Sequence, residues 1–182
     1  MKPPHSSIKF AILLATHNGI SWVEEQLLSI LKQVKVSVIV FVSDDMSTDG
    51  TFEKISFMAQ LYENIIVLPR KKHGTPARNF HYLLTSSDFS NYDYVSFSDQ
   101  DDIWDDSKLR HATRMIEQDG LDGYSSNVIA FWGNGREKLV KKSFPQKKFD
   151  YFFEAAGPGC TYVLKQQSAQ KFKKFLIKNW EN

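Results

Sequence analysis

Short apolar runs alternate with amphipathic segments along the first two-thirds of the chain. Four runs are β-branched or continuously apolar and have the length of buried strands: residues 8–15, 36–42, 64–68 and 94–97. Between and after them, apolar residues recur at helical spacing or polar caps introduce a helix: residues 21–34, 51–62, 75–86 and 106–118. This alternation predicts an α/β fold with a mainly parallel sheet covered by helices on both faces.

Two helix starts carry specific signals. Ser21 and Glu24 have the spacing of a capping box, and Thr75-Pro76 has the pattern of an N-cap followed by proline in the first turn. The last third is less regular. It predicts strands at 127–131 and 160–164, a turn at Asn134-Gly135, a basic loop over 138–148 and a final amphipathic helix at about 166–179.

Composition narrows the class of protein. The 182 residues include 23 basic and 21 acidic ones, a net charge of +2, which argues against a nucleic-acid binder. One cysteine excludes an intrachain disulfide framework and a cysteine-rich zinc site. No apolar run approaches the ~20 residues of a membrane span, and the polar N-terminus has no signal-peptide pattern. A cytoplasmic protein is therefore expected.

Polar clusters follow each of the four predicted strands: residues 16–19, 44–45, 70–74 and 99–102. In an open parallel sheet, ligands bind beyond the carboxyl ends of the strands, so these clusters are expected to meet at one edge. Asp99, Asp101 and Asp102 place three carboxylates within four residues, which favours a bound Mg²⁺ or Mn²⁺ that also contacts substrate phosphates. The alternative is that Asp101 and Asp102 only begin the next helix.

The other clusters leave two interpretations open. Asp44 and Asp45 have the chemistry to accept hydrogen bonds from a base or ribose, but acids are also common in a tight turn before a helix. The basic residues of 70–73 and Arg78 would neutralise a diphosphate or form a solvated surface. No G-x-G-x-x-G or G-x-x-x-x-G-K-[ST] loop is present, so phosphate binding would depend on a cation and basic side chains.

Three segments together are similar to signatures of the family-2 glycosyltransferases. They are Ala15-Thr16-His17-Asn18-Gly19, then Ser43-Asp44-Asp45-Met46-Ser47-Thr48-Asp49-Gly50-Thr51, then Ser98-Asp99-Gln100-Asp101-Asp102-Ile103-Trp104. The third resembles the form found in bacterial rhamnosyltransferase-like members, and Gly157-Pro158-Gly159-Cys160-Thr161 resembles an acceptor-side segment of the same group.

The resemblance implies a GT-A fold: a Rossmann-like nucleotide-sugar-binding half, residues 1–120, and a partial acceptor-side region, residues 121–182. It implies a nucleotide-diphosphate-sugar donor, dTDP-rhamnose or a UDP-sugar, and Mg²⁺ or Mn²⁺ as cofactor. Asp99-x-Asp101 matches the D-x-D motif, with Asp99 toward the ribose and metal and Asp101 on the metal. The other implied nucleotide-binding residues are Thr16, Asn18, Asp44, Asp45 and Arg78.

The resemblance also implies an inverting transfer to a glycan or lipid-linked acceptor, with peripheral association of the full-length protein at the inner membrane face. The catalytic base is unknown from this chain: Glu181 is the only acid after Leu164, so the base is expected beyond Asn182, and the chain is expected to bind donor but transfer sugar poorly. Two alternatives stay open, a non-catalytic nucleotide-sugar-binding fragment and a metal-dependent phosphotransfer or phosphatase domain.

Overall fold

The computed structural model describes residues 7–145, 147–149, 152 and 155–180. Six strands form one sheet in the order β3-β2-β1-β4-β8-β5. The strands are β1 (Ile8–Thr16), β2 (Val36–Asp44), β3 (Ile65–Val67), β4 (Tyr94–Ser98), β5 (Gly123–Tyr124) and β8 (Val163–Lys165). The first four are parallel, whereas β8 is antiparallel to both β4 and β5. The predicted α/β fold with a mainly parallel sheet is confirmed.

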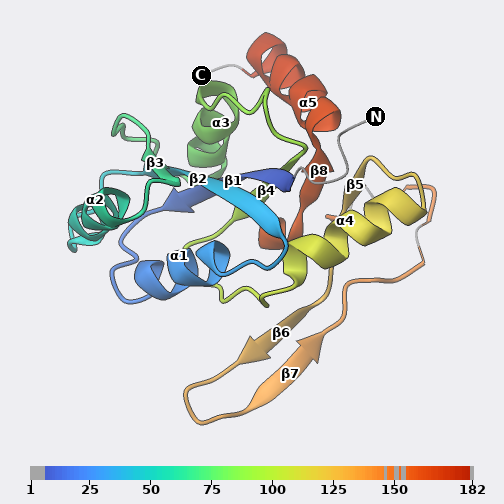
Figure 1. Ribbon diagram of the computed structural model, residues 1–182, viewed down its shortest axis with the longest axis horizontal. Coiled ribbons are helices and arrows are strands. Elements are labelled where there is room, and N and C mark those ends of the chain that lie inside the picture. Colours follow the sequence, from blue (N-terminus) through green and yellow to red (C-terminus); the bar gives the residue numbers. More distant parts are fainter. Residues whose placement is uncertain (1–6, 146, 150–151, 153–154, 181–182) are drawn as a thin grey trace.

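Helices cover both faces of the sheet (Figure 1). They are α1 (Val23–Leu31), α2 (Thr51–Leu61), α3 (Pro76–Ser86), α4 (Lys108–Gln118) and α5 (Gln166–Asn179). The first apolar core joins one face of β1, including Phe10 and Ile12, to α1, α2 and α4. The second joins the other face, including Ala11 and Leu13, to α3 and α5. Alternate residues of β1 therefore serve both cores, as the pleat requires and as its continuous apolar sequence predicts.

The local predictions were right for one helix start and wrong for the other. The Thr75 side chain accepts a hydrogen bond from the Arg78 N–H at 3.3 Å, and Pro76 opens α3 as predicted. The predicted capping box at Ser21 is wrong, because α1 begins at Val23 with Trp22 as its N-cap. The Gly19 carbonyl instead accepts from the N–H groups of Trp22 and Val23, both at 3.0 Å.

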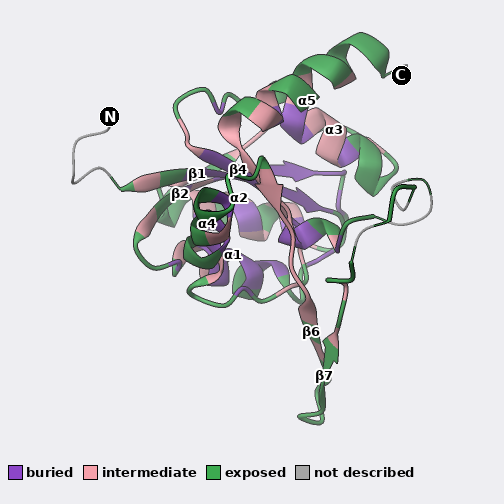
Figure 2. Cartoon of the chain, turned by 90° about the vertical axis from the view of Figure 1, so that its right-hand side faces the viewer, coloured by how far each residue is buried: buried purple, intermediate pink, exposed green. Residues whose placement is uncertain are grey.

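The last third contains more strand than predicted. The basic stretch predicted as a loop, residues 138–148, overlaps β7 (Glu137–Val140), which pairs with β6 (Val128–Phe131) in a separate two-stranded antiparallel sheet. The predicted strand at 160–164 is shorter, because the 3₁₀ helix η2 (Gly159–Thr161) precedes β8. The β6–β7 hairpin extends away from the main body, and much of its surface is exposed (Figure 2).

The register of the parallel strands brings three polar loops to one edge. Thr16, the last residue of β1, is the partner of Asp44 in β2, and Leu14 is the partner of Ser98, the last residue of β4. The segments after β2, β1 and β4 therefore leave the sheet side by side. Among the described residues, no helix has both the length and the apolar character needed to cross a bilayer.

Candidate functional site

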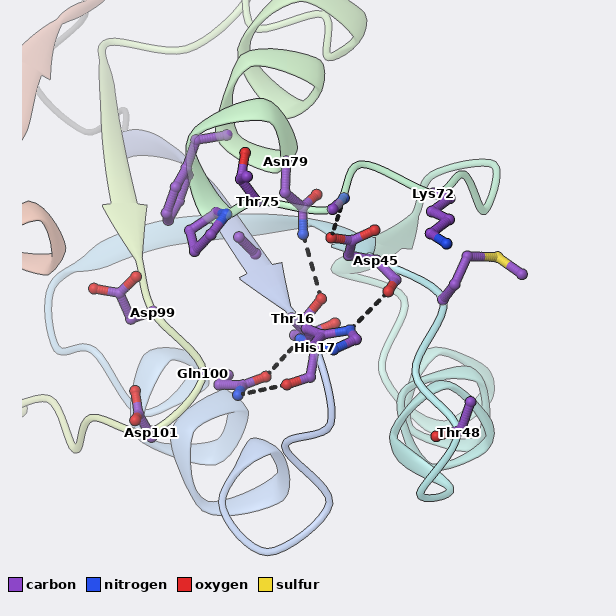
Figure 3. A pocket seen from close by; sticks show the side chains of 15 residues that line it. Thr16, His17, Asp45, Thr48, Lys72, Thr75, Asn79, Asp99, Gln100 and Asp101 are labelled. Carbon is purple, nitrogen blue, oxygen red and sulfur yellow. Dashed lines mark hydrogen bonds between the residues drawn. The ribbon is translucent and has the colours of Figure 1, made fainter.

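A pocket of about 760 Å³ lies at this edge of the sheet (Figure 3). It is lined at the end of β1 by Thr16 and His17, at the end of β2 by Asp45, and at the end of β4 by Asp99 and Asp101. The segment leading into α3 closes another side, with Lys72, Gly74, Thr75, Pro76 and Asn79. The polar loops predicted to meet at one edge do meet there. Three acids, Asp45, Asp99 and Asp101, line the same cavity as the basic residue Lys72.

Asp45 fastens the basic loop to the rim of this pocket. Its carboxylate accepts hydrogen bonds from the backbone N–H groups of His73 and Gly74, the second at 2.7 Å. Its carbonyl oxygen lies 2.7 Å from His17 Nδ1. Each carboxylate oxygen has a second lone pair, so Asp45 retains the capacity to accept from a ligand N–H or hydroxyl. Burial lowers the pKa of His73, and the Asp45 carboxylate opposes this effect only in part. The net shift favours a neutral imidazole in this loop.

The carboxylates after β4 are crowded. Burial, together with the neighbouring Asp102 and Asp101, raises the pKa of Asp99 to about 6, and Lys108 partly offsets this effect. One oxygen of Asp102, Oδ2, is buried and accepts no hydrogen bond from any group in the described part of the chain. A buried carboxylate oxygen without a donor is costly, and it indicates that this cluster is built for a positive ligand.

These residues fit a divalent cation. Asp99, Asp102 and Cys160 each have a ligand atom within 4.8 Å of the others, while Asp101 faces the pocket beside them. Burial, followed by the neighbouring Asp102 carboxylate, raises the pKa of the Cys160 thiol to about 12, so its sulfur is protonated when no cation is bound. Oxygen ligands without a thiolate suit Mg²⁺ or Mn²⁺ better than a soft metal.

Lys108 lies behind the acidic cluster and was not among the residues selected from the sequence. Its Nζ donates to the Cys160 carbonyl at 2.6 Å and lies 3.2 Å from the centroid of the Trp104 ring. Burial lowers the pKa of Lys108 to about 7, against the opposing effects of Cys160, Asp102 and Asp99. No spacing rule in the sequence links a lysine at the start of α4 to a backbone carbonyl 52 residues later.

Two of the predicted nucleotide-binding residues stabilise loops and do not line the pocket. The buried Asp44 carboxylate pairs with Arg70 Nε at 2.9 Å and accepts from the Ser47 N–H at 3.0 Å and its hydroxyl. Asn18 has a φ of 49°, and its side-chain oxygen accepts from the Thr48 N–H at 2.9 Å. These contacts account for both residues as turn formers, the alternative left open by the sequence for Asp44.

Arg78 also lies outside the pocket, whereas its neighbour Asn79 lines it. The Arg78 side chain borders a separate surface hollow with Lys71, His81 and Trp180. Asn79 is buried, and its Nδ2 donates to the carbonyls of Thr16 at 3.3 Å and Ser43 at 3.1 Å. Because α3 presents successive residues on different faces, only one of the two can face the sheet edge. The resemblance implicated the segment Arg78-Asn79, and the structure places the second of these two residues at the pocket.

The fold and the pocket have the architecture of the GT-A class of glycosyltransferases. The family model described as "Glycosyl transferase family 2" matches residues 11–175, and the chain belongs to this family. It is 48% identical over 168 residues to the dTDP-rhamnosyl transferase RfbG of Shigella flexneri. It is 24% identical over 160 residues to an Escherichia coli relative, the UDP-Glc:alpha-D-GlcNAc-diphosphoundecaprenol beta-1,3-glucosyltransferase WfgD. The matches cover 91% and 85% of this chain but 58% of each relative.

Solved structures share the fold at low sequence identity. The crystal structure of S. aureus TarS 1-349 in complex with UDP-GlcNAc matches with a TM-score of 0.65 and 22% identity, over 94% of this chain and 47% of that one. The mannosyltransferase PcManGT of Pyrobaculum calidifontis, in complex with GDP-Man and Mn²⁺, matches with a TM-score of 0.65 and 16% identity, over 90% of this chain and 46% of that one. The GT-A fold inferred from the motifs is confirmed.

Proposed function

We propose that this chain forms the donor-binding part of a metal-dependent, inverting glycosyltransferase that takes dTDP-rhamnose as donor. The single observation that carries the proposal is the convergence of Thr16, Asp45, Asp99 and Asp101 on one pocket. The 48% identity to a dTDP-rhamnosyl transferase favours dTDP-rhamnose over the UDP-sugars.

Within this proposal, the residues of the pocket divide into two groups. Thr16 and Asp45, at the ends of β1 and β2, take the nucleoside, because Asp45 has acceptor capacity for a base N–H. Lys72 lies on the basic loop at the pocket rim and attracts the diphosphate. Asp44 and Asn18 do not contact the nucleoside in this proposal. Their hydrogen bonds fix the turn that follows Asp45.

The acidic residues after β4 hold the cation. Asp99 and Asp101 provide ligands, with Asp102 beside them, and the cation supplies charge neutralisation at the diphosphate when bound. The positive charge of Lys72 lies near the same leaving group. It stabilises the negative charge that develops on the diphosphate as the bond to the sugar breaks.

The acceptor is a glycan or a lipid-linked sugar whose hydroxyl attacks the anomeric carbon as the bond to the diphosphate breaks. Inversion follows from a single displacement, and a carboxylate base removes the hydroxyl proton. The name of the E. coli relative specifies a diphosphoundecaprenol-linked acceptor, which supports a lipid-linked substrate for this protein as well.

Calorimetry of the 182-residue chain with dTDP-rhamnose, UDP-glucose and GDP-mannose, each with and without Mn²⁺, tests the donor and metal assignments. We expect dTDP-rhamnose to bind most tightly and to require the cation. Tighter binding of UDP-glucose would overturn the choice of donor, and equal affinity in EDTA would overturn the metal assignment.

Matched variants test the site itself. Asp101→Asn should lower the affinity for Mn²⁺ and dTDP-rhamnose about tenfold or more, since a metal ligand becomes neutral. Asp119→Asn changes an exposed acid at the far end of α4 and should leave both affinities unchanged. Binding of donor by the chain without transfer by the longer protein would favour the alternative, a non-catalytic nucleotide-sugar-binding module.

A further inference from the structure

The β6–β7 hairpin is separate from the rest of the structure. Among the residues that the structure describes, its two strands pair with each other and not with the six-stranded sheet. In two views at right angles the hairpin projects from the body, on the side of the sheet that carries α1 and α4 (Figures 1 and 2). A two-stranded ribbon of this kind is marginally stable on its own and gains from a surface against which it can pack.

The hairpin exposes large apolar side chains. Ile129 and Leu139 are direct cross-strand partners, and each is about three-fifths exposed, at 59% and 60%. Phe131 lies two residues from Ile129 on the same face of β6, and Trp132 begins the turn. Both aromatic side chains are exposed as well. A group of neighbouring apolar residues on a projecting element indicates an interaction surface more strongly than scattered ones.

The same segment carries most of the positive charge imbalance of the chain. Residues 127–148 contain six basic residues and one acidic residue, a net charge of +5. The remaining residues contain 17 basic and 20 acidic ones, a net charge of −3. The positive charge is therefore concentrated where the apolar side chains are exposed, and it selects an anionic partner.

Basic and aromatic side chains alternate in space along this segment. The Arg136 guanidinium lies 5.1 Å from the Trp132 ring centroid, and Lys141 Nζ lies 5.3 Å from the ring centroid of Phe144. Lys148 and Phe149 repeat the arrangement at 5.3 Å. Aromatic rings at the level of lipid headgroups, with lysine and arginine reaching the phosphates, are the chemistry of interfacial membrane binding.

We propose that the β6–β7 hairpin, with the basic and aromatic residues as far as Phe149, docks this protein on a bilayer that contains anionic phospholipids. The exposed apolar side chains enter the headgroup region, and the basic residues pair with lipid phosphates. Both signals are needed, because either one alone gives only weak, reversible attachment.

The position of the hairpin relative to the acidic cluster supports this surface over others. Ile129 and Phe131 form one wall of a second cavity, about 510 Å³, whose other walls include Asp102, Trp104 and Cys160. Docking through the hairpin therefore brings this cavity, next to Asp99, toward the lipid surface. This orientation of the cavity matters only under the proposed function, in which the acceptor is lipid-linked.

Helix α5 is the competing surface and provides the control. It carries four lysines and no acid, with Phe172 and Phe175 exposed. However, α5 packs over α3, on the sheet face opposite α1 and α4 (Figure 1). Docking through α5 would not bring the cavity beside Asp102 to the membrane.

The test is co-sedimentation of the 182-residue chain with vesicles of phosphatidylethanolamine and phosphatidylglycerol, compared with vesicles of phosphatidylcholine. We expect binding to the anionic vesicles only, weakened by added salt as screened charges require. Arg136→Gln/Lys138→Gln/Lys141→Gln should lower this binding about tenfold or more. The matched variant Lys171→Gln/Lys174→Gln/Lys178→Gln on α5 should have a much smaller effect.

Trp132 gives a second readout that does not depend on charge. Its fluorescence should shift to the blue on anionic vesicles, and Trp132→Phe should remove that shift while leaving Trp22, Trp104 and Trp180 in place. A full shift in the Trp132→Phe variant would contradict insertion of the hairpin tip.

Three outcomes would overturn the proposal: equal binding to both kinds of vesicle, a larger loss from the α5 variant, or binding of single-stranded DNA through the hairpin lysines without binding to vesicles. Donor affinity, measured in the same hairpin variants, should be unchanged. If the wild-type chain binds donor but not vesicles, the docking surface alone is rejected. If it binds vesicles but not donor, the proposed function alone is rejected.

Discussion

Gln100 and His17 are joined by two hydrogen bonds that run in opposite directions. The Gln100 side-chain oxygen accepts from the His17 N–H at 2.8 Å, and its nitrogen donates to the His17 carbonyl at 3.0 Å (Figure 3). The middle residue of the Asp-Gln-Asp segment thus binds the end of β1. Its two neighbours, Asp99 and Asp101, line the pocket.

Gln100→Ala should therefore loosen the acidic loop. We expect a loss of about 1 kcal/mol in the free energy of unfolding, measured with urea, because both bonds lie at an exposed edge. The affinity for Mn²⁺ should fall by about 1 kcal/mol as well, since Asp99 and Asp101 lose their fixed placement. Gln118→Ala, at an exposed position in the last turn of α4, should change neither quantity.

Gly19 provides a control for the same contact. A Cβ at this position would overlap the Gln100 side-chain amide, so Gly19→Ala should displace Gln100 and weaken Mn²⁺ binding. The three atoms nearest to the new Cβ all belong to the Gln100 amide, so Gly19→Ala should cost little more once Gln100 is alanine. Additive losses in the double variant would show that the two residues act independently.

The pKa of Asp99 predicts a pH dependence for the metal-free chain. Burial and the adjacent carboxylates raise it from 3.8 to about 6, so the folded chain holds this proton more tightly than the unfolded chain. The stabilising contribution of the protonated group is complete below pH 3.8 and is lost as pH rises through 6. Asp99→Asn should accordingly raise the free energy of unfolding at pH 7 by about 1 kcal/mol in EDTA, after allowance for solvent screening.

Urea denaturation at pH 4 and pH 7 measures this difference. The advantage of Asp99→Asn over the wild type should appear at pH 7 and nearly vanish at pH 4. With Mn²⁺ present the order should reverse at pH 7, because only the ionised Asp99 binds the cation. A variant that is equally destabilised at both pH values would show that Asp99 is not strained by its neighbours.

The pKa of Lys108 predicts a pH dependence of stability with the opposite sign. Burial lowers its pKa from 10.5 to about 7, so the folded chain holds this proton less tightly than the unfolded chain. The cost of the buried charge is present below pH 7 and is relieved as pH rises. The wild type should gain about 2 kcal/mol between pH 7 and pH 9, and Lys108→Met should lack that gain. Lys174 is an exposed lysine of α5, and Lys174→Met should retain the gain in stability between pH 7 and pH 9, measured by thermal and urea unfolding.

The Asp44–Arg70 ion pair predicts a coupled stability effect. Arg70→Ala leaves the buried Asp44 carboxylate without its counter-ion and removes the guanidinium from the Phe52 ring, 4.5 Å away. We expect a loss of about 2 kcal/mol, below the value for a fully buried pair because Arg70 is partly exposed. The loss should shrink when Asp44 is replaced by Asn, which carries no charge.

Asp44→Asn separates loop support from ligand contact. If Asp44 acts only through the loop, dTDP affinity in this variant should remain near the wild-type value while Asp45→Asn lowers it. The expected difference is about tenfold, since Asp45 is the member of the pair that lines the pocket. An equal loss of dTDP affinity in both variants would indicate that Asp44 contacts the nucleotide directly.

Periodicity predicted the fold well where local sequence and tertiary packing agree. The first four strands and their helices were located within a few residues because each buries a continuous or periodic apolar pattern. The hairpin was missed in part because β7 is the sequence Glu-Lys-Leu-Val, whose charges indicate a loop while its pairing with β6 decides its structure. The two residues of β5 carry no periodic signal.

The candidate site was predicted at the level of segments and less well at the level of side chains. The rule that parallel strands end at one edge located Thr16, Asp45, Asp99 and Asp101 together. It could not determine which of two adjacent acids turns toward the pocket. Asp44 points to Arg70 because of a contact with a residue 26 positions away, which local sequence does not encode.

Strand β8 lies between β4 and β5 in the sheet, although it follows both in the sequence by many residues. Its partners in β4 are about seventy positions earlier, and β8 is the last strand of the sheet to be synthesised. During synthesis on the ribosome, β1, β2 and β4 are therefore expected to assemble first. The edge strand β5 must wait until residues 163–165 have emerged.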